Sequence, residues 1–391
     1  MVARVSKAEE AGHGVDARAA GSYPCFDGIR AIAALSVIVY HAVFFTSWFQ
    51  TPGGSFLWNL NSGVWVFFVT SGFLLYRPFV EANLNDGRPV GLRGYAIRRV
   101  ARIYPAYWAV LAFFTFVIPK TNLAGVGESL RNVTLTQTYV PARNPFLVGV
   151  PPAWSLVVEI TFYAVLPLYA AAVGLAARRW TAPAVELIGV GLLAVAGLAA
   201  VVAIAEGYPA PWITVLPQNL MAFACGMLAA VLTARRSADR TLLRLQRLGR
   251  PAWLWWTLAG LAFISIPLVL RVEPFEPLGP GQTIGISLCQ TVIGACIVLP
   301  AVFGPQDHGL IRRVLRSRVL VFLGVISYGL YLWHWFVLQI VQTDWLGWSL
   351  REGSWVVLLV VALPVVIAAA SISWYALERP VMRSAHAFSR S

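Results

Sequence analysis

Hydrophobic residues in this chain gather in long continuous runs rather than in short or alternating segments. A helix rises 1.5 Å per residue, so about 20 residues cross the roughly 30 Å hydrocarbon core of a bilayer. Each run is close to that length, which predicts an all-α, polytopic membrane protein with about ten transmembrane helices. The runs lie at residues 29–49, 63–80, 101–118, 153–176, 184–205, 211–233, 252–270, 282–303, 319–341 and 354–377.

The composition supports this prediction and argues against a soluble enzyme. Of the 391 residues, 58% are hydrophobic and only 12% are charged, whereas soluble domains carry about 25% charged residues. A soluble domain of this size could not cover its surface with so few charges, and a disordered chain would be far less hydrophobic. The net charge of +13 is explained by a membrane rather than by nucleic acid, because the basic residues form short clusters between the apolar runs.

The distribution of basic residues predicts the orientation of the helices. When the segments between ten helices are assigned alternately to two sides, one side carries 25 of the 30 Lys and Arg residues and the other carries 5. Cytoplasmic loops are enriched in Lys and Arg, so both termini are predicted to be cytoplasmic. The expected organisation is a polar cytoplasmic segment at 1–25, a transmembrane domain at 26–380 and a cytoplasmic tail at 381–391, with the protein in the cell membrane.

Three ionisable residues stand inside the predicted spans, where such groups are costly and usually face a cavity. His41 lies eleven residues after Arg30, roughly 16 Å from the inner face, and His334 lies in the outer half of its span. Glu159 enters its span from the outside. These depths predict that His41, Glu159 and His334 meet in one cavity that opens outward. Structural interpretations remain open: a histidine bonded within the core, an interfacial anchor, or a carboxyl group that joins two helices.

Arginines on the inner side offer a complementary site for an anion. Arg99 and Arg102 are three residues apart at the predicted start of the third helix, so they share a helix face. Arg30 starts the first helix, and Arg98 precedes Arg99. Guanidinium groups bind phosphates through two parallel hydrogen bonds. The alternative is the ordinary positive-inside signal, which we favour for Arg98.

Metal chemistry finds no support in the sequence. The four cysteines are Cys25, Cys225, Cys289 and Cys296; they form no CxxC pair and no Cys/His spacing typical of a metal site. All four lie in or beside apolar runs, where a cysteine behaves as a small buried hydrophobic residue.

Several segments resemble the acyltransferase 3 family of integral membrane acyltransferases. Arg30 and His41 match the arginine and histidine, with ten residues between them, that mark the first helix of that family. Two departures are found: Phe336 stands where many members have proline, and Ile160 stands where many have a second acidic residue or glutamine. The similar segments run in family order and are FDGIRAIAALSVIVYH (26–41), GVWVFFVTSGFLL (63–75), RRVARIYPAYW (98–108), WSLVVEITFY (154–163) and SYGLYLWHWF (327–336).

This resemblance implies O-acylation of a hydroxyl group on a carbohydrate, a glycolipid or a related acceptor. The usual donor is an acyl-CoA, with acetyl-CoA the foremost expectation, and no metal is required. We interpret His41 as the general base, because an alcohol needs a base within hydrogen-bond reach; an acyl-His41 intermediate is the alternative. Glu159 is expected to be a catalytic residue that orients the acceptor or the imidazole. The expected ligands of the CoA phosphates are Arg30, Arg99 and Arg102. The expected acceptor-binding residues are Trp154, Tyr331 and His334.

Two other classes of protein remain open from the sequence. A proton-coupled transporter or flippase of a glycolipid would also use a histidine and a glutamate inside the membrane. Transporters usually show internal repeats or paired broken helices, and we find no such pattern here. A scaffold or sensor without catalytic activity would have no need of a histidine at position 41.

Overall fold

The computed structural model describes residues 23–85, 89–139, 148–208, 215–234, 240–274, 276–305 and 308–388. Within these ranges the ordered elements are all helical, and eight helices are long and apolar enough to cross a membrane. The predicted all-α membrane fold is therefore confirmed. The main helices of these spans are α2 (Cys25–Phe45), α4 (Gly63–Leu84), α5 (Leu92–Ala112), α7 (Trp154–Ala176), α8 (Ala182–Ala205), α9 (Leu220–Ala234), α12 (Pro280–Phe303) and α16 (Trp355–Ser373).

The two remaining apolar runs are also helical, but neither is a straight span of full length. The helix α11 (Ala252–Leu268) has 17 residues. The run at 319–341 is broken into α14 (Arg318–Val325) and α15 (Ser327–Ile340), which meet at an angle of 74°. Hydropathy alone could not predict this break, because apolar residues continue through it. All ten predicted runs thus have a helical counterpart, and one of them is bent inside the protein.

Two helices begin earlier in the chain than the sequence predicted. The helix α5 begins at Leu92, so Arg98, Arg99 and Arg102 lie within it rather than at its start. The helix α2 begins at Cys25, five residues before Arg30. Helical geometry continues past the end of an apolar run wherever the next residues can still form backbone hydrogen bonds. The guanidinium groups are consequently held on rigid helix.

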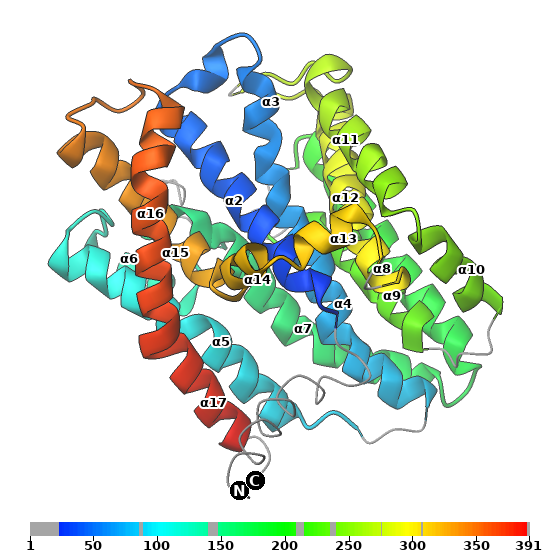
Figure 1. The fold of residues 1–391 in the computed structure, drawn as a ribbon. Coiled ribbons are helices and arrows are strands. Elements are labelled where there is room, and N and C mark those ends of the chain that lie inside the picture. Colours follow the sequence, from blue (N-terminus) through cyan, green and yellow to red (C-terminus); the bar gives the residue numbers. More distant parts are fainter. Residues whose placement is uncertain are drawn as a thin grey trace, which may run out of the picture.

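The two ends of the chain differ in how far the structure describes them. The proposed polar segment at 1–25 lies outside the described residues except for its last three. At the other end α16 continues through a π-helical turn (Trp374–Glu378) into α17 (Arg379–Phe388). The expected tail is therefore helical through Phe388. Figure 1 shows α16 and α17 as one long column, and α17 packs beside α5.

The short helix α6 (Gly125–Thr134) lies in the loop between the third and fourth spans and was not predicted. Three aromatic side chains of α5 donate hydrogen bonds to backbone carbonyls near its C-terminal end. Tyr107 binds the carbonyl of Asn132 at 2.8 Å, and Trp108 binds that of Val133 at 2.9 Å; Tyr104 reaches Thr134. The last carbonyls of a helix lack partners within it, so these contacts fix α6 against α5.

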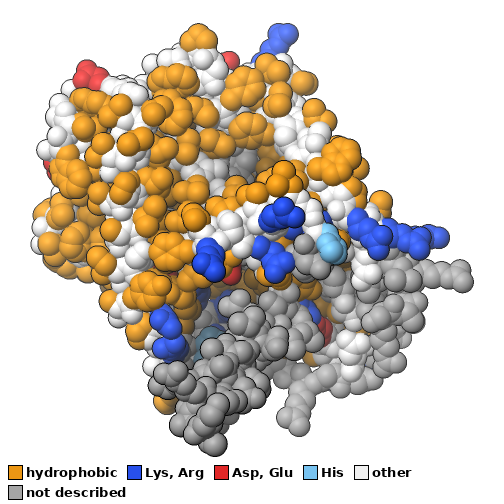
Figure 2. Space-filling model, viewed as in Figure 1, with side chains coloured by type: hydrophobic (Ala, Val, Ile, Leu, Met, Phe, Trp, Pro, Cys, Tyr) orange, Lys and Arg blue, Asp and Glu red, His pale blue; other side chains and the backbone are white. Residues whose placement is uncertain are grey.

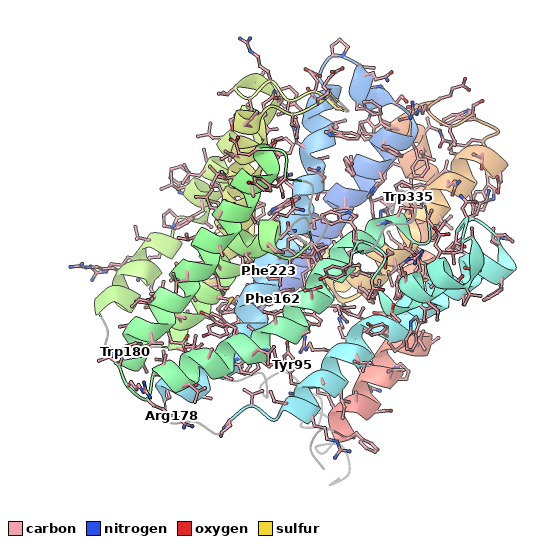
Figure 3. All side chains as sticks on the ribbon, turned by 180° about the vertical axis from the view of Figure 1, so that it is seen from behind. Tyr95, Phe162, Arg178, Trp180, Phe223 and Trp335 are labelled. Carbon is pink, nitrogen blue, oxygen red and sulfur yellow. The ribbon has the colours of Figure 1, made fainter. Side chains whose placement is uncertain are left out.

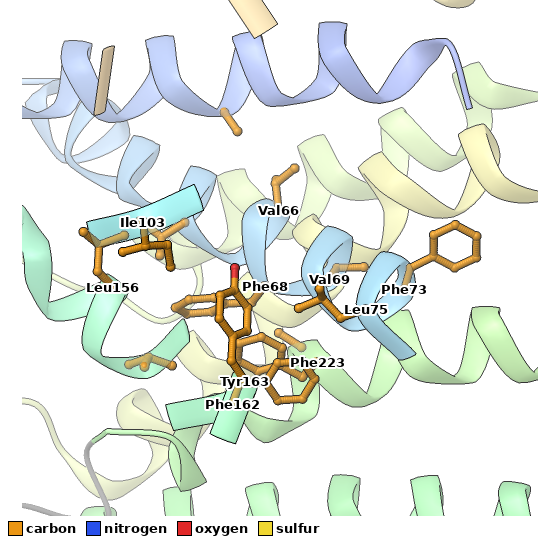
Figure 4. Close-up of a cluster of buried hydrophobic side chains, with 14 of the residues drawn as sticks. Val66, Phe68, Val69, Phe73, Leu75, Ile103, Leu156, Phe162, Tyr163 and Phe223 are labelled. Atoms are coloured by element: carbon orange, nitrogen blue, oxygen red, sulfur yellow. The ribbon is translucent and has the colours of Figure 1, made fainter. Parts of the chain in front are cut away.

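The centre of the molecule is built around α4 and α9, which cross closely because each helix has a glycine against the backbone of the other. A Cβ atom on Gly226 would lie 2.0 Å from the carbonyl oxygen of Val69, so only glycine fits there. Beside this crossing the rings of Phe68 and Phe162 both stack on Phe223, at centroid distances of 4.9 and 4.0 Å. Figure 4 shows this aromatic cluster, and Figure 3 labels Phe162 and Phe223 at the middle of the bundle.

A buried arginine outside the spans joins α13 (Leu310–Leu315) to the core. Arg312 donates hydrogen bonds to the carbonyls of Gly249 at 2.6 Å and Pro300 at 2.8 Å, and to Arg250. Burial lowers the pKa of Arg312, but a guanidinium group remains charged at any physiological pH. Arg312 therefore serves the fold by satisfying carbonyls at the end of α12.

The outer surface of the bundle suits a lipid environment. Figure 2 shows hydrophobic side chains over most of one face, with Lys and Arg gathered across its lower part. On α8, Ile188, Leu192 and Val195 are each more than 60% exposed. Water would not tolerate so large an apolar surface on a monomer, whereas lipid tails do. The protein is therefore a multi-pass membrane protein.

Candidate active site

Two histidines from distant parts of the sequence are joined in the middle of the bundle. Nε2 of His334 on α15 lies 2.9 Å from Nδ1 of His41 on α2. His334 is completely buried, whereas His41 keeps some accessible surface although its neighbours Ala42 and Val43 have none. The predicted meeting of His41 and His334 is thus present in the structure as a direct contact.

The hydrogen bonds of this pair assign its protons. Nδ1 of His334 lies 3.1 Å from the carbonyl oxygen of Leu330, which can only accept, so Nδ1 carries the proton. A neutral imidazole has one donor and one acceptor nitrogen, and Nε2 of His334 is therefore the acceptor. Nδ1 of His41 must then donate to it. Nε2 of His41 is left with a lone pair, which is the state that a general base requires.

Aromatic side chains surround the exposed side of His41. Its ring meets Trp335 edge-on at a centroid distance of 5.0 Å and Tyr40 at 4.6 Å. Tyr40 in turn contacts Trp58, on the short helix α3 (Gly54–Trp58), at 4.9 Å. All three aromatic residues are half-buried. Trp335 is labelled in Figure 3, near the end of the bundle opposite Arg178.

A cavity of about 140 Å³ lies among α2, α4, α5, α7 and α15. It contains the predicted anion ligands together: Arg30, Arg99 and Arg102 all line it. Two hydroxyl groups on its wall, Thr70 Oγ1 and Ser327 Oγ, are buried and have no hydrogen-bond partner within the described part of the chain, and the same holds for Nε of Arg99. Buried polar groups normally have partners, so orphaned ones around a cavity indicate a place for a polar ligand.

Glu159 belongs to this cavity and is not hydrogen-bonded to either histidine. It accepts hydrogen bonds from Ser71 at 3.0 Å and from Tyr163. The expectation that Glu159 would orient the imidazole is therefore not supported by its contacts. The residue number sets how far a residue lies along the helix axis, but the direction of its side chain also depends on the rotation of the helix about that axis. Glu159 faces α4 and the arginines.

Two of the three arginines lie against aromatic rings. The guanidinium of Arg99 lies over the rings of Tyr95 and Tyr163, at 5.9 and 5.7 Å from their centroids. Arg102 lies over Tyr328 at 5.5 Å, and its Nη1 forms an ion pair with Glu378 at 4.0 Å and donates a hydrogen bond to Sδ of Met382. Cation–π contacts leave the N–H groups in the plane of the guanidinium available to an anion.

Tyr331 connects the cavity with the histidine pair. Its hydroxyl donates to the carbonyl of Pro152 and lies 2.8 Å from Ser155 Oγ, while its ring is 5.7 Å from that of His334. Tyr331 and Ser155 both line the cavity. The predicted acceptor-binding residue Trp154 is different: it is half-buried against the hydrophobic core and is not part of the cavity wall. The adjacent Ser155 takes that place.

Ser327 and Glu378 are among the residues of the site that were not predicted from the sequence. Ser327 is the first residue of α15, and Tyr331 and His334 lie four and seven residues after it. This spacing places the three residues on one face of the helix. This spacing could have been found within the segment 327–336. Glu378 is 2% exposed and lies in the π-helical turn between α16 and α17. No local signal connects it with Arg102, which is far away in the sequence.

Comparison with known proteins shows the family to which the chain belongs. Residues 23–374 match a family model described as an acyltransferase domain, and the chain therefore belongs to the acyltransferase 3 family. It is 27% identical, over 92% of its length, to YrhL of Bacillus subtilis, whose name proposes peptidoglycan O-acetyltransferase activity. It is 27% identical to nodulation protein 10 of Rhizobium leguminosarum and 26% identical to the exopolysaccharide production protein ExoZ of Rhizobium meliloti.

The relatives differ in how much of their length is matched. The chain spans 54% of the length of YrhL, but 93% of nodulation protein 10 and 90% of ExoZ. The matched region makes up 92% of this chain in the comparison with nodulation protein 10 and 83% in the comparison with ExoZ. No solved structure matches the chain. Fold, family and relatives together place the chain in the class of integral membrane O-acyltransferases.

Proposed function

We propose that this protein transfers an acetyl or other short acyl group from cytoplasmic acyl-CoA to a hydroxyl group of a carbohydrate or glycolipid acceptor of the cell envelope. The observation that carries the proposal is the pairing of His41 with His334 next to a cavity lined by three arginines. A base and an anion site are the two requirements of acyl transfer from a phosphate-bearing thioester. The names of the relatives, which mention peptidoglycan and exopolysaccharide, support a carbohydrate acceptor.

The proton arrangement of the histidine pair supports a direct transfer. Nε2 of His41 takes the proton of the acceptor hydroxyl while the oxygen attacks the thioester carbonyl carbon, which gives a tetrahedral intermediate. The carbon–sulfur bond then breaks, and the thiolate of CoA takes the proton back from His41. His334 accepts the hydrogen bond of Nδ1 throughout and stabilises the charged imidazole. The products are the acyl ester and free CoA.

A covalent route uses the same residues. Nε2 of His41 would attack the thioester first and release CoA as its thiolate. The acyl group would then pass from the acyl-imidazole to the hydroxyl oxygen, while the hydroxyl proton goes to the thiolate and Nε2 is free again. Labelled acyl groups that stay on the protein after rapid acid quenching, in the absence of acceptor, would support this route.

Arg30, Arg99 and Arg102 are suited to bind the phosphates of the donor. The cavity is too small for a whole acyl-CoA, so it holds only a part of the donor, and three cations favour the phosphate-bearing part. Arg30 and His41 are eleven residues apart on α2, about 16 Å along the axis. The slender pantetheine arm can span such a distance and bring the thioester to the histidine pair.

The distribution of basic residues supports a cytoplasmic donor and an outward acceptor. We propose that both termini are cytoplasmic and that the protein lies in the cell membrane, because 25 of the 30 Lys and Arg residues fall on one side of the predicted topology. Figure 3 shows Arg178, Trp180 and Tyr95 at the end of the bundle opposite Trp335. The arginine cavity would then be reached from the cytoplasm, and the aromatic surroundings of His41 from the outer leaflet.

Transfer of labelled acetyl groups tests this function. Inside-out membrane vesicles that contain the protein and its native envelope glycans are supplied with radiolabelled acetyl-CoA. We expect alkali-labile label in the carbohydrate or glycolipid fraction, because an O-acetyl ester is cleaved by mild base. Vesicles without the protein provide the control. Equal labelling in both preparations would contradict the proposed function.

A further inference from the structure

The break between α14 and α15 puts the beginning of a helix inside the bundle. The two helices meet at 74°, and Ser327, the first residue of α15, lines the arginine cavity together with Tyr328 and Tyr331. The N-terminal end of a helix carries a partial positive charge, and in broken membrane helices such ends face anionic groups. α15 has 14 residues, which is enough for a substantial dipole.

An unpartnered hydroxyl group marks the same place independently. Ser327 is completely buried, and its Oγ has no hydrogen-bond partner among the described residues. A buried hydroxyl without a partner costs free energy, because it has given up its hydrogen bonds to water. A serine at this position is therefore explained by a ligand that completes its hydrogen bonds, since alanine would pack equally well without that cost.

The charges around Ser327 specify what kind of ligand group would bind. Arg102 lies over the ring of Tyr328, the next residue after Ser327, and Arg30 and Arg99 share the cavity. Two carboxylates lie near these arginines: Glu159, on the same wall, accepts hydrogen bonds from Ser71 and Tyr163, and Glu378 pairs with Arg102 at 4.0 Å. A hydroxyl donor, a helix N-terminus and three guanidinium groups together match a phosphoryl group, which has several acceptor oxygens and negative charge.

We propose that Ser327 and the N-terminal end of α15 bind a phosphoryl oxygen of the acyl donor. This inference rests on the proposed function, because it takes the donor to be an acyl-CoA. Ser327, Tyr331 and His334 share one face of α15, and Ser327 is seven residues from His334, about 10 Å along the axis. A phosphate held at Ser327 places the rest of the pantetheine arm along Tyr331, toward His334 and His41. Ser327 thereby positions the thioester without touching it.

Replacement of Ser327 by alanine distinguishes a role in donor binding from a role in the stability of the fold. In Ser327→Ala we expect a melting temperature of the donor-free protein equal to or higher than that of the wild type, because an unpaired hydroxyl is removed. The KM for acetyl-CoA should rise about tenfold, as is usual when a hydrogen bond to a charged group is lost. Turnover of S-acetylpantetheine, which has no phosphate, should be unchanged. Ser36→Ala is the matched control, because its hydroxyl bonds to Ala33 within α2.

Two further measurements separate the possible outcomes. Inorganic phosphate, CoA and vesicles of phosphatidic acid are compared as competitors of acetyl-CoA, since a free anion and a lipid headgroup share the same phosphoryl chemistry. Stronger competition by CoA than by either of the others, lost in Ser327→Ala, supports the proposal. An unchanged KM for acetyl-CoA in Ser327→Ala, or an equal rise for S-acetylpantetheine, overturns it. Wild-type protein that turns over neither thioester would instead contradict the proposed function itself.

Discussion

Each histidine in the central pair has a separate task that follows from its hydrogen bonds. The carbonyl of Leu330 fixes the proton of His334 on Nδ1, and His334 in turn fixes the proton of His41 on Nδ1. A histidine without this partner would distribute its proton over both nitrogens and could rotate about its side-chain bonds. In the proposed mechanism His334 therefore orients the base.

Removal of this orienting residue should reduce the rate without abolishing donor binding. In His334→Leu we expect kcat to fall by roughly 10²-fold, near the lower end of the effect of losing general base catalysis. The KM for acetyl-CoA should stay within about a factor of two, because no arginine is altered. Steady-state release of CoA measures both quantities. A KM that rises as much as kcat falls would show that His334 binds the donor instead.

The sequence predicted the depth of the site residues better than their directions. His41 and His334 could be placed at overlapping depth because each helical residue adds a fixed rise. Glu159 was placed at a similar depth, yet its side chain turns toward Ser71 and Tyr163. The rotation of α7 is set by its packing against α4 and the other helices, which no local pattern records. For the same reason Glu378 beside Arg102 could not be predicted.

Among the helices, straight spans were predictable and interruptions were not. The ten apolar runs gave the helices because every backbone group in a bilayer must be bonded internally. The bend between α14 and α15 occurs inside a continuous apolar run, and α6 lies in a loop of mixed polarity. Both features depend on contacts with other helices, such as the hydrogen bonds from Tyr107 and Trp108 to α6.

The close crossing of α4 and α9 makes a prediction about stability. In Gly226→Val the new side chain would collide with the backbone of Val69 and Phe73, where even a Cβ atom comes within 2.0 and 2.6 Å. Overpacking of this kind typically costs about 1–3 kcal/mol, so the melting temperature in detergent should fall by several degrees. Gly191→Val on α8, where a Cβ would meet nothing within 4 Å, is the control. Equal melting temperatures for the two variants would contradict the crossing.

On the scale of the whole molecule, the account requires that donor and acceptor approach from opposite sides. The cavity with the arginines and the aromatic surroundings of His41 are joined through Tyr331 and His334. Such an arrangement lets an acyl group cross most of the membrane while CoA remains in the cytoplasm. The proposed mechanism would also account for the two histidines inside the bundle, because polar residues are costly in a bilayer.

The proposed orientation is tested by cysteine labelling in intact cells. A cysteine is introduced at Val126 on α6 or at Leu310 on α13, both highly exposed, after replacement of the four native cysteines. A membrane-impermeant maleimide should label Val126→Cys in intact cells and Leu310→Cys only after lysis. The reverse pattern would invert the donor and acceptor sides. Labelling of both variants in intact cells would contradict the helix count.

The most direct test of the whole account is the activity of His41→Ala with acetyl-CoA. The purified variant should release CoA in the presence of native acceptor at least 10²-fold more slowly than the wild type, because the group that takes the hydroxyl proton is gone. Its melting temperature and its affinity for CoA should remain close to the wild-type values. Arg98→Ala, on α5 but outside the cavity wall, should keep full activity. Wild-type turnover by well-folded His41→Ala would contradict the assignment of the catalytic base and, with it, the proposed mechanism.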